Sequence, residues 1–598
     1  MLFSLFAQLA AVGTVIWLVV RAVTRHRRDA QTGSVDTAAA ARRLVLYALL
    51  LATAIVSTIG AGGLAGEAVR DASFAGRSTS TIARSLAFLL VGVPAWLLLL
   101  RFGVRRLAGF GTAAGMNAPE AVEERQSAGW FLYINVTLAV SLIVSMVFAQ
   151  QVLRQLFGND GLERQDLSTL VIWVAVWALH WFWLQARFPP SDQVQLAVGS
   201  AAGLVASSLG LHQVVTDAIE RLWPDLRPDL FTGSDSRFSG GLATLAVGAA
   251  VWVWHWQLRY RRSEPDVVWQ VVTRLLGRLG GLAAAAVGGA VSAYTTLVWF
   301  VGDPLDTVAS RHFDSLPGTL AALIIGSLIW WYHVDICNDR AATADTERLE
   351  PQRIFEYLTA AAGLGAAVAG VTLAVVGLTE ALTPVPFAGQ DRVVNRMLAA
   401  ITVLAVGLPI WLLQWVRVGR VTATSGLDAS LAERRSISRR VYLVGLFGIG
   451  GAVTLVSLLI MLTGIFEDLL DDTFGSQSIR SQRVPLGLIV AIAGSAWYHF
   501  TIFRNDRRVM EDMLPPPPPT ATLASPRHIV LVSADTNGLA ERVAVATGAE
   551  VTHWHRSDLA AIPMVDVGAL AARIAASDKD RLLVLIDEVG TTLVPFDE

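Results

Sequence analysis

Long apolar runs constrain this chain more than any other feature of its sequence. Stretches of about 20 residues with almost no charge recur along most of its 598 residues, and about 20 apolar residues let an α-helix cross a bilayer. Only 16% of the residues are charged, whereas a typical soluble chain carries roughly 25%. The sequence therefore excludes a wholly soluble globular protein and a disordered one, and it predicts an all-α polytopic membrane protein.

A short pattern rich in tryptophan and histidine recurs six times. Its copies begin at Trp96, Trp177, Trp252, Trp330, Trp411 and Ala496. The residues at one shared offset within these copies are Leu99, His180, His255, His333, Gln414 and His499. In each copy the pattern closes the second helix of a pair, and internal repetition of this kind indicates repeated structural units. We therefore expect six helix hairpins of one kind.

The apolar runs place the two helices of each hairpin. The expected pairs are 42–64 with 85–101, 130–153 with 168–186, 193–214 with 239–258, 272–300 with 316–334, 354–379 with 397–416, and 441–465 with 484–503. Residues 2–20 add one more helix, and because arginines follow rather than precede it, we expect a retained helix and not a secretory signal. The prediction is about 13 transmembrane helices.

These helices and the changes in composition define the expected organisation of the chain. It comprises an N-terminal helix (1–24), hairpin repeats over 40–126, 127–192, 193–268, 269–350, 351–438 and 439–512, a proline-rich linker (513–526) and a cytoplasmic α/β domain (527–598). The seven loops on one side hold 28 arginines and the six on the other side hold 13. Because arginine excess marks the cytoplasmic side, we expect the N-terminus outside and the C-terminus inside a bacterial plasma membrane.

Small residues concentrate in the first helix of each hairpin. Ala360 to Gly370 holds three glycines and six alanines, and Gly445, Gly448, Gly450 and Gly451 repeat the theme in the last hairpin. In lipid, helices associate through close backbone approach at small residues. We therefore expect the first helices to form the interior of the bundle, and the bulkier second helices to face lipid.

The repeated histidines are the only candidate site among the helices. One hypothesis is structural: tryptophans form an interfacial aromatic belt, arginines reach phosphate, and each histidine makes one hydrogen bond. The alternative is that His180, His255, His333 and His499 face inward at one depth and bind haem, a metal or a quinone headgroup, because imidazole suits all three. Leu99 and Gln414 interrupt such a ring, so we predict no cofactor, no metal site and no catalytic residue.

Two of the six copies carry a further pattern, Gly92-Val-Pro94-Ala-Trp96-Leu-Leu and Gly407-Leu-Pro409-Ile-Trp411-Leu-Leu. This pattern resembles an uncharacterised bacterial membrane family, domain of unknown function 5671, over most of residues 40–510. The resemblance implies a polytopic membrane protein and carries no activity and no functional residues with it.

The tail beyond the linker has the composition of a soluble domain. Strands are expected at 528–533, 550–555 and 581–586, with a possible fourth at 591–595, and helices at 537–547 and 565–576. This alternation predicts a small α/β layer with a partly parallel sheet, and about 72 residues is small enough that the domain could dock or dimerise. Leu582 to Glu588 has the shape of a Walker B strand but no phosphate loop accompanies it, and the loop 533–538 and the His553/His555 pair are weak anion and metal motifs.

The sequence favours a non-enzymatic scaffold or signalling protein whose tail contacts a cytoplasmic protein. A transporter or channel with a neutral path lined by glycine and alanine is the first alternative, and a membrane enzyme or haem- or quinone-binding protein using the four histidines is the second. The net charge of −2 gives no field for nucleic acid, so the expected partners are the lipid bilayer and a protein. The sequence leaves the oligomeric state open.

Overall fold

The computed structural model describes residues 37–69, 79–158, 161–189, 194–223, 234–304, 306–342, 350–383, 393–424, 427–512, 528–534, 538–556, 565–577, 579–587 and 590–596. The predicted N-terminal helix (1–24) and proline-rich linker (513–526) lie outside these residues. The chain divides into two compact units, 1–504 and 505–598, and each is described by itself.

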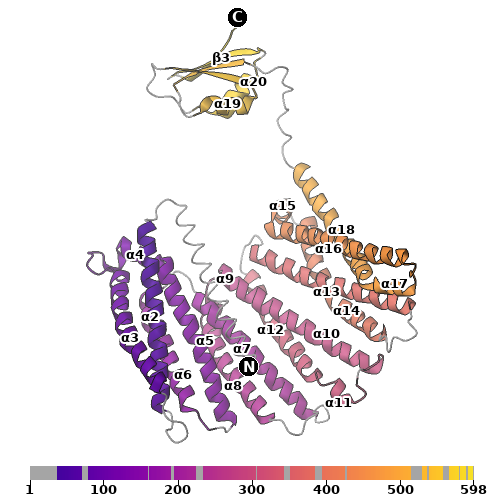
Figure 1. The fold of residues 1–598 in the computed structure, drawn as a ribbon. Coiled ribbons are helices and arrows are strands. Elements are labelled where there is room, and N and C mark those ends of the chain that lie inside the picture. Colours follow the sequence, from indigo (N-terminus) through magenta and orange to yellow (C-terminus); the bar gives the residue numbers. More distant parts are fainter. Residues whose placement is uncertain are drawn as a thin grey trace. The chain divides into compact units, whose positions relative to one another are not determined.

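The long helices of the first unit form six pairs (Figure 1). They are α2 (Thr37–Val69) with α3 (Thr79–Leu107), α5 (Ala128–Gly158) with α6 (Arg164–Ala178), α7 (Val194–Leu222) with α8 (Ser234–Trp252), α10 (Gly280–Phe300) with α12 (Leu316–Ala342), α13 (Glu350–Leu382) with α14 (Val393–Thr424), and α16 (Ile437–Leu470) with α18 (Arg483–Asp512). Within the described ranges, 12 helices are long and apolar enough to cross a membrane. All 12 helices expected for the hairpins are present.

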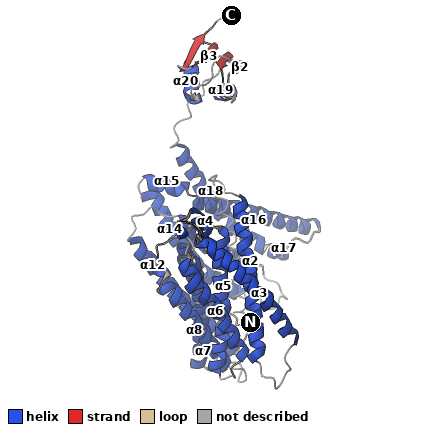
Figure 2. Cartoon of the chain, turned by 90° about the vertical axis from the view of Figure 1, so that its left-hand side faces the viewer, coloured by secondary structure: helices blue, strands red, loops and turns tan. Residues whose placement is uncertain are grey.

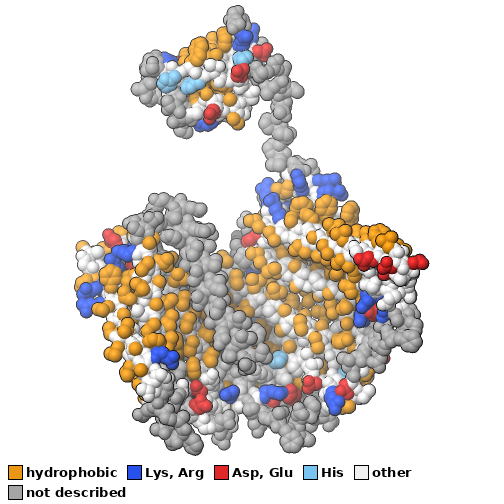
Figure 3. Space-filling model, in the orientation of Figure 1, with side chains coloured by type: hydrophobic (Ala, Val, Ile, Leu, Met, Phe, Trp, Pro, Cys, Tyr) orange, Lys and Arg blue, Asp and Glu red, His pale blue; other side chains and the backbone are white. Residues whose placement is uncertain are grey.

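Shorter segments join or extend these helices. They are η1 (Gly115–Asn117), α4 (Pro119–Gln126), η2 (Leu179–Gln185), η4 (Val253–Gln257), η5 (Tyr260–Arg262), α9 (Val267–Gln270), η6 (Val271–Leu279), α11 (Ala309–His312), α15 (Leu427–Arg435) and α17 (Ser476–Ser481). The segments η2, η4 and η6 are π-helical, and η2 and η4 continue α6 and α8. Hydrophobic side chains cover much of the visible face of the helical unit, and charged ones gather toward its two ends (Figure 3).

Glycines bring the helices of hairpins 3, 4 and 5 into backbone contact. A Cβ added at Gly203, Gly281 or Gly363 would lie 2.5 to 2.6 Å from the backbone nitrogen of Trp252, Trp330 or Trp411 in the partner helix. On the partner helix α8, a Cβ at Gly248 would lie 2.3 Å from the nitrogen of Ser207. Only glycine fits at this separation, which is the close approach expected from the small residues.

Burial differs between the two helices of a hairpin. In α5, 72% of the most apolar 18-residue stretch is buried, against 17% in the partner helix α6. The first helix is the more buried one in five of the six hairpins. The exception is hairpin 4, where α10 is 28% and α12 is 33% buried. The first helices therefore form most of the interior of the unit, as their composition predicted.

Hairpin 6 departs from the glycine pattern. A Cβ added at Gly445, Gly448 or Gly451 would meet nothing within 4 Å, and only Gly450 lies close to α18, at 3.1 Å from the Cβ of Ala496. The prediction that these glycines mark a closely packed helix pair is therefore wrong for three of the four. The reason is that α18 contacts α16 at this depth through Gly450 and Phe447, whereas the other three glycines lie elsewhere around the helix.

The tail unit is a four-stranded sheet with helices α19 (Leu539–Thr547) and α20 (Val567–Ala575) (Figure 2). Its strands are β1 (His528–Ser533), β2 (Glu550–His555), β3 (Arg581–Asp587) and β4 (Gly590–Pro595), in the order β2-β1-β3-β4. β1 pairs in parallel with β2 and β3, and β4 runs antiparallel to β3. This confirms the small, partly parallel α/β layer and its fourth strand.

A separate hydrophobic core holds the tail together. Leu539 and Val543 from α19, and Leu570 and Ile574 from α20, pack on Ile529, Leu531, Leu582, Val584 and Ile586 of the two central strands. Alternate residues of a strand point to opposite faces of the sheet, so both helices cover the face that carries this set.

Candidate functional site

The repeated histidines lie where one hairpin packs against the next. Each contacts a tryptophan of the preceding hairpin. The ring centroids are 6.4 Å apart for Trp96 and His180, 5.4 Å for Trp181 and His255, 6.1 Å for Trp256 and His333, and 5.3 Å for Trp415 and His499. All four histidines are buried. The repeated pattern is therefore an interlock between successive hairpins.

The four histidines share one local hydrogen bond. Nδ1 donates to the backbone carbonyl four residues earlier, at 2.8 Å for His180, 2.9 Å for His255, 2.8 Å for His333 and 2.7 Å for His499. A carbonyl only accepts, so this bond places the proton of the neutral ring on Nδ1 and leaves Nε2 as the acceptor. In His180, Nε2 accepts from the Tyr133 hydroxyl at 2.9 Å.

Two of these rings are fitted against glycines of the first helix in their own hairpin. A Cβ at Gly199 would lie 2.3 Å from the His255 ring, and a Cβ at Gly277 would lie 2.3 Å from the His333 ring. His180 and His255 also stand in the π-helical segments η2 and η4, where backbone hydrogen bonds span five residues and the helix is wider than an α-helix. The imidazoles thus fill shaped spaces between helices.

This arrangement bears on both interpretations of the pattern. Trp256 and Trp415 are buried between hairpins, while Trp331 and Trp497 are 65% and 67% exposed, so only part of the tryptophan set faces outward as an aromatic belt would. In the described part of the chain, no group of three His, Cys, Asp or Glu side chains is placed to hold a metal ion. The four histidines serve four separate contacts.

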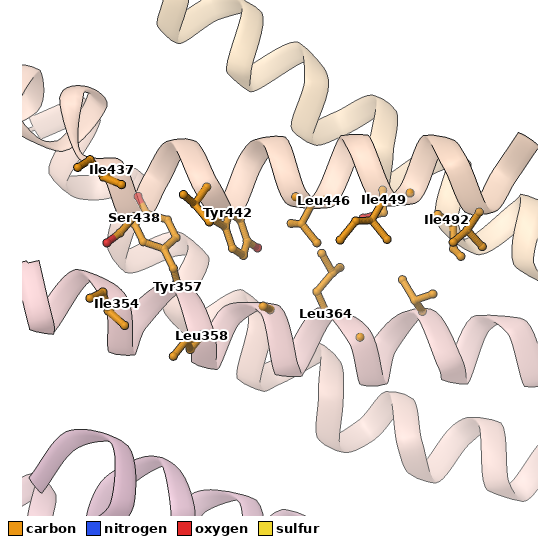
Figure 4. A pocket seen from close by; sticks show the side chains of 18 residues that line it. Ile354, Tyr357, Leu358, Leu364, Ile437, Ser438, Tyr442, Leu446, Ile449 and Ile492 are labelled. Carbon is orange, nitrogen blue, oxygen red and sulfur yellow. The ribbon is translucent and has the colours of Figure 1, made fainter. Parts of the chain in front are cut away.

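A pocket of about 610 Å³ lies between hairpins 5 and 6 (Figure 4). It is lined by α13, α16 and α18, and almost every lining side chain is apolar; Leu364, Leu446, Ile449 and Ile492 are among them. Gly365 and Gly445 also line it and meet nothing within 4 Å, which leaves the space open. Its volume falls within the ~300–1,000 Å³ of ligand pockets, and its chemistry suits a hydrocarbon.

One end of this pocket is polar. The Tyr357 hydroxyl donates to Glu433 at 2.6 Å, and Arg353 donates to the same carboxylate at 3.1 Å. Arg439 donates to the Tyr357 oxygen at 3.3 Å, so a buried network ties α13 to α15 and α16. The sequence analysis missed this network, because its members stand about 80 residues apart and look like ordinary loop charges.

Glu350 joins the same two hairpins outside the apolar window of α13, which begins at Gln352. It accepts from the Ser438 hydroxyl at 2.5 Å and from Arg353 at 3.0 Å. Partial burial by itself would raise the pKa of this carboxyl, but the hydrogen bonds from Ser438 and Arg353 outweigh it and lower the pKa. The carboxylate is therefore ionised at neutral pH and holds the ends of α13 and α16 together.

The weak motifs of the tail resolve into local contacts. His553 Nε2 lies 2.9 Å from the Ser533 hydroxyl, and the His553 and His555 rings are 6.3 Å apart. The strand with the Walker B shape is β3, whereas Glu588 and residues 535–537 of the possible anion loop lie outside the described residues.

A family model described as "Domain of unknown function (DUF5671)" matches residues 58–163, 193–287 and 353–496. These three regions include more than half of the chain and take in the polar end of the pocket, His255 and Gln414. No curated protein and no solved structure matches the chain.

Proposed function

The chain belongs to the DUF5671 family, and from its own architecture we propose that it is a multi-pass bacterial plasma-membrane protein that acts as a scaffold or in signalling. In this proposal the interlocked hairpins form a membrane platform, and the tail is a cytoplasmic contact module. The observation that carries it is the division of the chain into a helical unit with repeated interlocks and a tail with its own core. The arginine asymmetry of the loops supports an outer N-terminus and an inner C-terminus.

Reporter fusions test the membrane part of this proposal. A reporter active only in the cytoplasm should be active after Glu598, and one active only outside should be active in the 217–237 loop. The opposite pattern at either position would refute the orientation, and a chain recovered in the soluble fraction would refute the membrane assignment itself.

The pocket between α13 and α16 favours one second candidate, a transporter of an apolar molecule. Its lining would accept hydrocarbon but gives a hydrated ion few partners, so an ion channel has less support. Purified chain in vesicles separates the two functions. We expect no flux of Na⁺, K⁺ or protons, and directional movement of a fluorescent fatty-acid analogue between leaflets would favour the transporter over the scaffold.

The third candidate, a haem or quinone protein, rests on the four histidines. The Nδ1 atom of each histidine donates a hydrogen bond to a carbonyl of its own helix, and each histidine lies at a different junction between hairpins. We predict that purified protein carries no haem or transition metal in a fixed ratio. A stoichiometric Soret band that His255→Gln removes would overturn this.

A further inference from the structure

The tail has an apolar sheet face that its own helices do not cover. In the described part of the tail, α19 and α20 both pack on the face carrying Ile529, Leu531, Leu582, Val584 and Ile586. The alternate residues point the other way. These include Val530, Val532, Leu583 and Leu585, which are half-buried, together with Trp554 and Val594, which are 59% and 42% exposed.

The strand register arranges this open face in rows. One row across the four strands is Thr552, Val530, Leu583 and Val594, and the next is Trp554, Val532, Leu585 and Thr592. Six of these eight residues are apolar, in adjacent strands of a twisted sheet. Because the helices cover only the other face of the sheet, these side chains form a contiguous exposed apolar patch. Such a patch marks an interaction site.

Charged residues occupy the two ends of the same face. At the end where β1 begins, His528 is paired in register with Glu550 and with Arg581, and its Nδ1 lies 3.2 Å from the Glu550 carboxylate. At the opposite end, Asp587 closes β3 and Arg556 directly follows β2. Along β3 the face therefore runs from a positive to a negative residue, and along β2 from a negative to a positive one.

This pattern is self-complementary for one geometry. Consider two such faces that pack against each other and are related by a two-fold axis, which lies between the sheets and runs perpendicular to the strands. Each strand then lies over its own copy in the reverse direction. Arg581 then lies over Asp587 of the second copy, and Glu550 over Arg556 of the second copy. The two apolar rows exchange places in the centre, which is the arrangement of sheets packed face to face about 10 Å apart.

We propose that the open sheet face of the tail binds a second copy of this chain, forming a two-fold symmetric, antiparallel sheet-on-sheet dimer. Symmetric self-association is the commonest mode of assembly and requires a self-complementary patch. The balance of charges on this face also argues against an anionic membrane as its occupant, because such surfaces attract clusters of lysine and arginine. The inference deepens the proposed function, since it names the partner of the contact module.

Charge reversal tests this geometry in the full-length chain. Two differently tagged copies are purified in detergent, mixed and tested for co-purification over a range of concentrations. Wild-type copies should associate. Arg581→Glu should place two acidic residues against each other at both symmetric contacts and raise the Kd at least tenfold, and Asp587→Arg should do the same with two basic residues.

The decisive arm mixes the two variants. A pair formed by one Arg581→Glu chain and one Asp587→Arg chain restores opposite charges at both contacts, so this mixture should associate to within about threefold of wild type although neither variant associates with itself. A misfolded variant could not be rescued in this way. Val545→Glu is the matched control, because Val545 is 87% exposed on α19, on the helical side of the tail, and its substitution should leave association unchanged.

Three results would overturn the proposal. They are a monomeric wild-type chain, association that survives both charge reversals, and loss of association that mixing does not restore. A chain ending at residue 512 locates the contact: its association should be lost, and association equal to that of the full chain would place the interface in the helices and refute the sheet dimer. The reporter fusions test the membrane assignment independently, so failure of either proposal is recognised separately.

Discussion

Hairpins 3 to 5 and hairpin 6 start from the same composition and end in opposite packing. In hairpins 3 to 5, a Cβ added at glycines of the first helix would lie only 2.2 to 2.6 Å from backbone atoms of the second helix. In hairpin 6, Gly445, Gly448 and Gly451 face open space, and the pocket between α13 and α16 opens beside one of them. The comparison teaches that a glycine permits close approach but does not cause it.

What differs is the surface that the neighbouring helix offers. In α8, α12 and α14, glycines of the second helix also meet backbone of the first: they are Gly248, Gly326 and Gly407. In α18, Gly494 meets nothing within 4 Å. Hairpin 6 is held to hairpin 5 by the polar network around Glu433, through Arg439, and by the Trp415–His499 contact.

The largest effect is expected from a bulky side chain placed where glycines hold two helices in backbone contact. A Cβ at Gly210 would lie 2.2 Å from the backbone nitrogen of Leu245, so Gly210→Leu must push α7 and α8 apart. We expect a loss of more than about 3 kcal/mol in the free energy of unfolding, measured in detergent, and poor recovery of folded protein. Gly448→Leu in hairpin 6 is the control and should be neutral or stabilise by up to ~1 kcal/mol, since leucine is the better helix former. Equal losses of stability in the two variants would show that hairpins 3 and 6 do not differ in how closely their helices pack at these glycines.

A smaller loss is expected from breaking the network that joins hairpins 5 and 6. Glu433→Ala removes the buried carboxylate that binds Arg353 and the Tyr357 hydroxyl, and it should cost about 3 kcal/mol in the free energy of unfolding. Glu123, whose side chain is 64% exposed in its ion pair with Arg43, provides the control. Glu123→Ala should cost less than ~1 kcal/mol. If the two variants have similar thermal midpoints, the network does not hold the hairpins together.

At the histidine contacts between hairpins, crowding the imidazole ring should destabilise the protein more than changing its hydrogen-bonding atoms. Gly199→Ala drives a methyl group into the His255 ring and should cost about 1–3 kcal/mol in the free energy of unfolding, whereas His255→Gln should cost only about 0.6 kcal/mol. Gln414 already fills the equivalent position in hairpin 5. In a double-mutant cycle, His255→Ala should remove most of the cost of Gly199→Ala, and additive costs would show that the ring does not occupy the space beside Gly199.

The smallest effect concerns pH. Because hydrogen bonding lowers the folded pKa of Glu350, its contribution to stability is present above the unfolded pKa of about 4.3 and is lost as pH falls through the lower folded value. Glu350→Gln should therefore cost under ~1 kcal/mol at pH 7, since the side chain is 41% exposed, and less at pH 3. Thermal unfolding of both proteins at the two pH values measures this, and a difference that grows toward low pH would contradict the assigned direction.

The sequence by itself determined the elements of this protein. Apolar runs placed all 12 described hairpin helices, because an α-helix needs about 20 apolar residues to cross a bilayer and the loops between these runs are polar. The alternation of short strands and helices placed every described element of the tail. The recurrence of His180, His255, His333 and His499 at one offset marked a repeated contact, although the pattern did not say with what.

Only the tertiary structure decided how those elements face one another. Whether Gly203 lies in a seam and Gly445 in a pocket depends on the partner helix, which hydropathy does not identify, because lipid and protein interior are equally apolar. The network at Glu433 joins residues far apart in the chain, so no local pattern announced it. In the tail, the sequence marked Val530 and Val532 as strand residues, but only the placement of both helices on the opposite face left these side chains open, because a strand points alternate residues to either face and its sequence does not say which face is covered.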